Sequence, residues 1–84
     1  MNLAATLQEG NKMRSDRRNK VRGDLEDYID GYSLDYVLRE ISIICDAKAE
    51  HISTYWQDNV LASDWSFIGK EINKVAEKAA KRGL

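Results

Sequence analysis

The chain has 84 residues, which allows one small domain with a core that usually needs self-association or unusually good packing for stability. It holds 43% apolar and 32% charged residues and no proline, a composition that favours long helices and excludes a loop-rich or all-β chain. The formal net charge of −1 argues against a dedicated DNA-binding protein. One cysteine, Cys45, excludes an intramolecular disulfide and a thiolate metal cluster. We therefore predict an all-α protein.

Cys45 lies within an apolar helical pattern, so we expect a buried thiol in a reducing compartment. The sequence has no apolar run of about 18 residues, the length that a membrane-spanning helix needs. The stretch from Met1 to Gln8 lacks the basic flank and the apolar length of a secretory signal. These features predict a cytoplasmic protein without a membrane partner.

The region 1–31 is predicted to contain a basic arm followed by an acidic elbow. In the arm, six basic side chains stand against one acidic side chain, Asp16; they are Lys12, Arg14, Arg17, Arg18, Lys20 and Arg22. Met13 and Val21 are the only apolar side chains there, so the sequence leaves open whether the arm is helical or disordered. Gly23 is expected to end the arm.

The acidic elbow is predicted as one or two helical turns between Asp24 and Gly31. Asp24 is a suitable N-cap, and Asp27 occupies the position of a capping-box carboxylate. Gly31 is expected to provide a left-handed exit. The elbow would then lead directly into the main helices.

The region 32–84 predicts an antiparallel helical hairpin, with helices over about 33–56 and 59–81, in a chain that forms one domain overall. Ser33 is a good N-cap for the first helix, with Tyr32 and Val37 at the hydrophobic-staple positions. The apolar residues of this helix recur at three- and four-residue steps that define one face: Leu34, Leu38, Ile41, Cys45 and Ile52.

The second helix follows a turn at 57–59, and either Asp58 or Asn59 is expected to cap it. A second possible start lies one turn later, where Ser63 precedes Asp64. The predicted seam of this helix steps by four and three residues and comprises Leu61, Trp65, Ile68, Ile72, Val75 and Ala79. Gly83 stands just past the seam as a stop signal. The aromatic residues near the hinge, Tyr55, Trp56 and Trp65, are expected in the core.

Several apolar residues lie away from the predicted seam and form a second stripe. Tyr36, Ile43 and Ala47 form this stripe on the first helix, and Val60 and Phe67 lie off the seam in the same way near the start of the second. We expect all five at an oligomer or partner interface. Either the elbow folds back over them, or two or more copies pack as a dimeric or higher helical bundle. The small size of the chain favours the bundle.

The sequence indicates no enzyme, cofactor or metal site. His51 is the only histidine, and its neighbours Ser53 and Thr54 diverge around the helix, so no nucleophile constellation forms. The glycines are scattered and form no phosphate-binding loop. A third-ranked alternative is an all-α metal-dependent nucleotide hydrolase, whose carboxylates would be Asp46, Glu50, Glu71 and Glu77.

The basic arm carries the leading functional prediction, the capture of an anionic ligand. If the arm is helical, Arg14, Arg17 and Arg18 share a face and could bind a nucleotide-like signalling molecule or nucleic-acid phosphates. Small helical oligomers with which phages sequester signalling nucleotides have this general design, and the analogy suggests a phage or bacterial origin. The alternative is an adaptor or inhibitor that docks on a larger protein through the arm or the second stripe.

Overall fold

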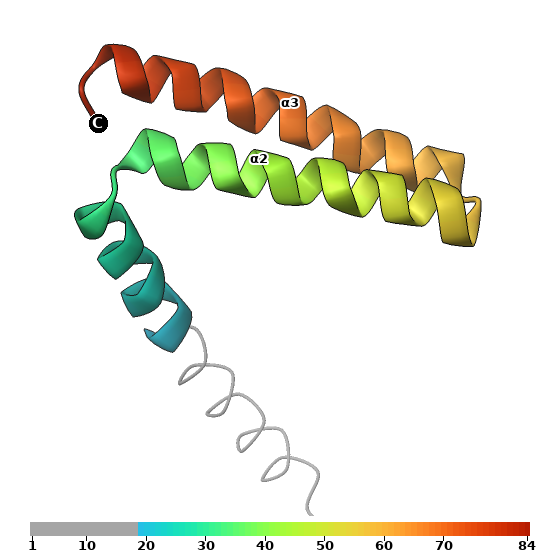
Figure 1. Ribbon diagram of the computed structural model, residues 1–84, viewed down its shortest axis with the longest axis horizontal. Helices are drawn as coiled ribbons and strands as arrows, with labels where there is room; N and C mark the ends of the chain where they lie inside the picture. The colour runs from blue at the N-terminus through green and yellow to red at the C-terminus, as the bar shows by residue number, and fades with distance from the viewer. Residues whose placement is uncertain (1–18) are drawn as a thin grey trace, which may run out of the picture.

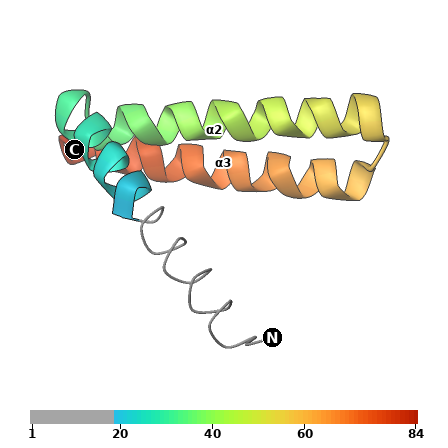
Figure 2. The same cartoon turned by 90° about the horizontal axis from the view of Figure 1, so that it is seen from below.

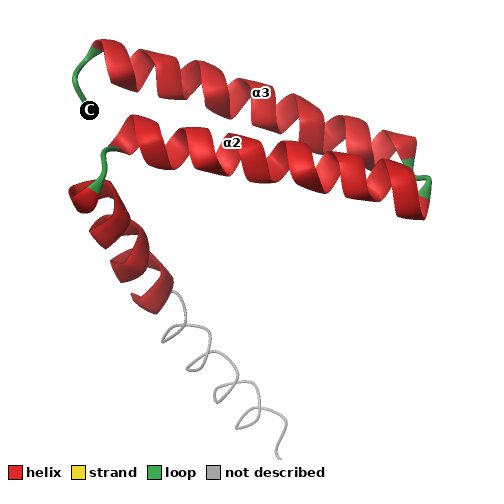
Figure 3. Ribbon diagram, viewed as in Figure 1, coloured by secondary structure: helices red, strands yellow, loops and turns green. Residues whose placement is uncertain are grey.

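The computed structural model describes residues 19–84 and shows three α-helices and one π-helical turn in this part of the chain (Figures 1 and 3). A helix over 19–31 is followed by α2 (Leu34–His51), a π-helical turn η1 (Ile52–Trp56) and α3 (Asn59–Lys81). Residues 19–84 contain no strand, so the all-α class is confirmed for them. In two views, α2 and α3 lie side by side and run in opposite directions, while helix 19–31 leaves the start of α2 at an angle (Figures 1 and 2).

Helix 19–31 joins two segments that the sequence predicted as separate. Gly23 does not end the basic arm, and Asp24 does not start a new helix, because the helix runs through both positions. A glycine inside a helix costs about 1 kcal/mol but places no steric block on the backbone. Gly31 is not a left-handed exit either, since Gly83 is the only glycine of residues 19–84 with a positive φ.

The start of α2 agrees with the prediction from sequence. Ser33 is the N-cap, and its Oγ accepts a hydrogen bond from the backbone N–H of Tyr36 at 3.2 Å. The same hydroxyl donates to Oδ1 of Asp35 at 2.6 Å. The backbone N–H of Asp35 donates to the carbonyl oxygen of Leu84 at 3.0 Å, which ties the end of α3 to the start of α2. Two backbone N–H groups in the first turn of α2, those of Asp35 and Tyr36, therefore have hydrogen-bond acceptors.

Replacing Ser33 by alanine is expected to destabilise α2 by about 1 kcal/mol through loss of the cap. The hydrogen bond from Ser33, aided by the backbone of Tyr36 and by Arg39, holds the pKa of Asp35 below its ordinary value, and this pKa should rise in Ser33→Ala. Because the pKa of Asp35 is lower in the folded protein than in the unfolded chain, its carboxylate stabilises the fold at a pH above the unfolded-state pKa. This contribution is lost as the pH falls through the folded-state pKa. The stability difference between the two proteins should therefore shrink in acid.

Carbon-detected NMR titration of the Asp35 carboxyl group, with denaturation at neutral and acidic pH, measures both effects. Ser63→Ala is the matched control, because Ser63 is exposed within α3 and caps no helix. An unchanged Asp35 pKa in Ser33→Ala would show that the hydroxyl is not its main determinant.

The π-helical turn η1 changes the direction in which the hinge aromatics point. In a continuous α-helix, Trp56 would share a face with the buried Ile52, four residues earlier. A π turn uses more residues than an α turn and rotates the side chains that follow it. Tyr55 and Trp56 are therefore exposed, contrary to the core position predicted for them, and Trp65 is half-buried. Gln57, which is left-handed with φ 54°, then ends the turn.

The structure decides between the two predicted starts of α3. Asp58 is the N-cap, and its Oδ1 accepts a hydrogen bond from the N–H of Leu61 at 3.0 Å, so the helix begins at Asn59. At the other end, Gly83 has φ 75°, and the N–H of Leu84 donates to the carbonyl oxygen of Ala79 at 2.9 Å. This Schellman-type ending confirms Gly83 as the stop signal.

The contact between α2 and α3 is made by small side chains. The buried residues are Ser42 and Cys45 on α2, Ile52 at the start of η1, and Ala62, Gly69, Ala76 and Ala79 on α3. We call this set the small-residue seam. Three of its members, Ala62, Gly69 and Ala76, recur every seven residues, the period that keeps one helix facing its neighbour. The burial of Cys45, Ile52 and Ala79 was predicted.

The large residues predicted for the α3 seam mostly lie beside it. Leu61, Ile68 and Val75 are exposed, because α3 is turned by one residue from the predicted orientation and presents the following position to α2. The helices are closest at Gly69, where the Oγ of Ser42 donates to the Gly69 carbonyl oxygen at 2.7 Å. A Cβ atom at position 69 would lie 3.0 Å from the Cβ of Cys45. Such an approach is possible only for the smallest side chains.

Candidate interaction surface

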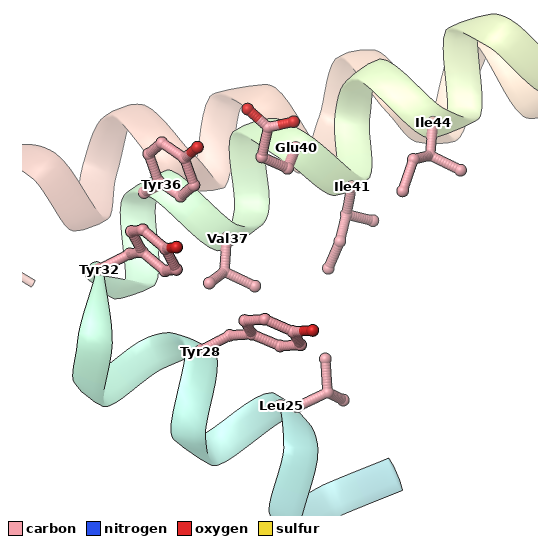
Figure 4. A pocket seen from close by; sticks show the side chains of 8 residues that line it. All are labelled: Leu25, Tyr28, Tyr32, Tyr36, Val37, Glu40, Ile41 and Ile44. Atoms are coloured by element: carbon pink, nitrogen blue, oxygen red, sulfur yellow. The ribbon is translucent and has the colours of Figure 1, made fainter.

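An apolar cleft lies between helix 19–31 and α2. Its volume is about 360 Å³, and its lining comprises Leu25, Tyr28, Tyr32, Tyr36, Val37, Glu40, Ile41 and Ile44. Figure 4 shows Leu25 and Tyr28 directed from helix 19–31 toward Val37 and Ile41 of α2. The rings of Tyr32 and Tyr36 stack with centroids 4.9 Å apart. Glu40 supplies the only carboxylate of an otherwise apolar and aromatic lining.

The apolar surface continues from the cleft across both helices of the hairpin. On α2, Ile41 and Ile44 each stand one position before a seam residue. On α3, Leu61, Ile68 and Val75 likewise precede seam residues. In an antiparallel pair, positions that precede the seam by one residue lie on the same side of both helices. We call these five residues, together with Val37, the apolar face.

A second hollow belongs to the same side of α3. Leu61, Asp64, Trp65 and Ile68 line it, and its volume is about 280 Å³. Trp65 is half-buried, and Leu61 and Ile68 are exposed. The apolar face is thus hollowed at two places, one beside helix 19–31 and one on α3.

The core that residues 19–84 build is small. None of their large side chains is less than 2% exposed, and the buried apolar set contains one large aliphatic residue, Ile52. Many large apolar residues are exposed, including Leu25, Tyr28, Ile44 and Ile68. Much of the apolar area that could stabilise the chain therefore remains in contact with solvent.

The residues predicted as an interface are all exposed, and those that line a hollow line different ones. Tyr36 lines the apolar cleft. Ile43 lies in a polar groove on the other side of the hairpin, and Ala47 lines a shallow hollow with Glu50 and Tyr55. Val60 and Phe67 are exposed on α3. The role of these five residues at an oligomer or partner interface stays a prediction.

Sequence reasoning missed Leu25, Tyr28 and Ile44 as surface-forming residues. No comparable signal marks these three residues, but the seven-residue recurrence of Ala62, Gly69 and Ala76 could have indicated the buried side of α3. A seam placed on these small residues would have turned the predicted α3 by one position. The large neighbours would then have appeared as an uncovered face.

The predicted anion-binding residues fall mostly outside the described part of the chain. Lys12, Arg14, Arg17 and Arg18 lie outside residues 19–84, so their prediction stays a prediction. Lys20 and Arg22 are exposed on helix 19–31, and neither lines the apolar cleft.

Residues 19–84 contain no group of three or more His, Cys, Asp or Glu side chains placed to hold a metal ion. The carboxylates of the third-ranked hydrolase alternative are dispersed: Asp46 lines the polar groove, Glu50 lines the hollow beside His51, and Glu71 pairs with Lys74 at 3.0 Å. The ring of His51 packs against Tyr55, with centroids 4.8 Å apart. This arrangement offers no support for metal-dependent hydrolysis.

Among the helices of residues 19–84, none combines the length and the apolar character that a membrane crossing requires. Comparison with protein-family models, with curated proteins and with solved structures found no match.

Proposed function

We propose that this chain is a small, non-enzymatic helical binding protein that self-associates through its apolar face. The observation that carries the proposal is the one-sided placement of exposed apolar residues. Ile44 on α2 and Ile68 on α3 stand on the same side of the hairpin, beside a seam that buries small side chains. Covering this face removes apolar area from water at about 25 cal/mol per Å².

A second copy of the chain is the occupant that best fits this face. Its apolar residues form an elongated strip. In a twofold dimer, the same strip on each subunit packs against the other, so no second kind of surface is needed. Helix 19–31 presents Leu25 and Tyr28 toward the same side, so it can extend the contact (Figure 4). The result is a dimeric or higher helical bundle, which gives a small chain the core that it lacks alone.

A pair of neighbouring isoleucines tests the proposal. Ile44 and Ile43 are 55% and 58% exposed, and only Ile44 belongs to the apolar face. Ile44→Glu is expected to weaken self-association roughly 30-fold or more, because an unpaired carboxylate in an apolar interface costs about 2 kcal/mol or more. Ile43→Glu should leave it unchanged. Sedimentation equilibrium over a range of protein concentrations measures both.

Two results would contradict this proposal. A wild-type chain that stays monomeric at high concentration has no self-association to explain. Weakening by Ile43→Glu that equals or exceeds that by Ile44→Glu would show that the interface is not confined to the apolar face. Circular dichroism of each variant separates a lost interface from a lost fold.

The adaptor or inhibitor alternative uses the same surface with a different occupant. Tyr28, Tyr32 and Tyr36 combine an apolar ring with a hydroxyl group, as residues that anchor protein partners often do. A monomeric wild-type chain would favour this alternative. Anion capture by the basic arm is tested separately, by native mass spectrometry of the protein from its own host and of a variant with Arg14, Arg17 and Arg18 replaced by alanine.

A further inference from the structure

The side of the hairpin opposite the apolar face contains a polar groove. Its residues follow the seam by one position or lie one turn from such a position: Ile43 and Asp46 follow Ser42 and Cys45, and Lys70 follows Gly69. The volume of the groove is about 550 Å³, within the range of small-molecule sites. Its lining comprises Arg39, Ser42, Ile43, Asp46, Lys70, Asn73 and Lys74.

Cations from both helices line this groove. Arg39 comes from α2, whereas Lys70 and Lys74 stand one turn apart on α3. Asp46 is the only carboxylate in the lining, so cations outnumber it three to one. The lining therefore carries three positive charges and one negative charge, a balance that favours an anionic ligand over a cationic one.

The existing ion pairs leave these cations available. Arg39 pairs with Asp35 at 3.7 Å and Lys74 pairs with Glu71 at 3.0 Å, each along its own helix. Neither carboxylate lines the groove. Exposed pairs of this kind contribute little, and their long side chains can turn toward a ligand. Within residues 19–84, Lys70 forms no ion pair.

We propose that this groove binds a small organic phosphate. The guanidinium of Arg39 offers a fork of donors, and two lysines offer point charges, a combination that suits the several oxygens of a phosphate. The amide of Asn73 adds a neutral donor, and Ile43 provides an apolar wall for the organic part of the ligand. The carboxylate of Asp46 opposes binding, because it repels the phosphate oxygens.

The site is separate from the basic arm and from the apolar face. It contains none of the residues predicted to bind an anion, and it lies on the other side of the hairpin from Ile44. Phosphate binding and self-association can therefore succeed or fail independently.

NMR titration of the isotopically labelled full chain with inorganic pyrophosphate tests the site. We expect saturable shifts of the amides of Arg39, Ile43, Lys70 and Lys74. Lys70→Gln and Lys74→Gln should each weaken binding about tenfold. Asp46→Asn should strengthen binding several-fold, because it removes the one negative charge of the lining. Lys48→Gln is the matched control, since Lys48 is an exposed lysine of α2 outside the groove.

Three outcomes would overturn the proposal: no saturable shift at millimolar pyrophosphate, equal weakening by Lys48→Gln, or weakening by Asp46→Asn. Adenosine triphosphate and a single-stranded oligonucleotide serve as further probes under the same conditions. Tighter binding of adenosine triphosphate than of pyrophosphate supports the organic phosphate and the role of Ile43. Tighter binding of the oligonucleotide through the same residues would replace a small phosphate with nucleic acid as the ligand.

Discussion

Gly69→Ala is expected to destabilise the hairpin, whereas Gly23→Ala should leave it unchanged or make the chain more stable. Both glycines lie inside helices, where alanine is intrinsically favoured by about 1 kcal/mol. A Cβ atom at position 69 would meet the Cβ of Cys45 at 3.0 Å and the backbone oxygen of Ser42 at 3.3 Å. At position 23 it would meet nothing within 4 Å. The same substitution should therefore have opposite effects.

The size of the Gly69 effect follows from two opposing contributions. Inserting a carbon into a filled contact costs about 1–3 kcal/mol, and the helix propensity of alanine offsets about 1 kcal/mol of this cost. Movement of α2 away from position 69 would also strain the hydrogen bond from Ser42 to the Gly69 carbonyl oxygen. Gly69→Val should be worse than Gly69→Ala, because valine adds more volume and has a lower helix propensity.

Urea denaturation followed by far-ultraviolet circular dichroism measures these differences. A Gly69→Ala protein as stable as Gly23→Ala would show that α2 and α3 can separate at no cost. In that case, the close approach at position 69 would not contribute to stability.

The second large effect is expected at Ile52. This side chain is 4% exposed and is the only large aliphatic residue among the buried residues of 19–84. Ile52→Ala should cost about 2–5 kcal/mol, because it removes buried methylene groups and leaves a cavity near the hinge. Since small domains have little stability to lose, we expect a large unfolded fraction or a broad transition.

Val60→Ala is the control at the same end of the hairpin. Val60 is 76% exposed, so Val60→Ala should change the midpoint of unfolding little. Both variants should be compared by thermal and chemical denaturation at one fixed protein concentration, because self-association makes apparent stability depend on concentration. Equal losses in the two variants would mean that Val60 is covered in solution, which would move the interface toward the hinge.

The helix ends could be predicted because their signals are local. Ser33, Asp58 and Gly83 each act through hydrogen bonds or a backbone conformation within a few residues. The boundary expected at Gly23 failed because a glycine and a following aspartate are compatible with a helix as well as with its end. The exposure of Trp56 was not predictable, because no simple periodicity signals a π-helical turn.

The faces of the hairpin could be predicted only in part. A search for large apolar residues at helical spacing finds the strongest stripe, but the closest contact between two helices selects the smallest side chains. On α3, the buried position is Gly69, one residue after the predicted Ile68. This rotation of α3 carries Leu61, Ile68 and Val75 out of the seam and onto the apolar face, whereas Cys45 and Ile52 keep the position predicted for them. The candidate surface therefore depended on a rotation that the sequence left open.

Substitutions in the small-residue seam should be tolerated less well than substitutions on either side of it. Ala76, which is 0% exposed, and Gly69 meet α2 with almost no room for additional atoms, so their replacement is limited by volume. Positions on either side of the seam, such as Ile44 and Lys70, meet no comparable limit. Recognition on either side can consequently diverge or be redesigned while the helix pair is retained.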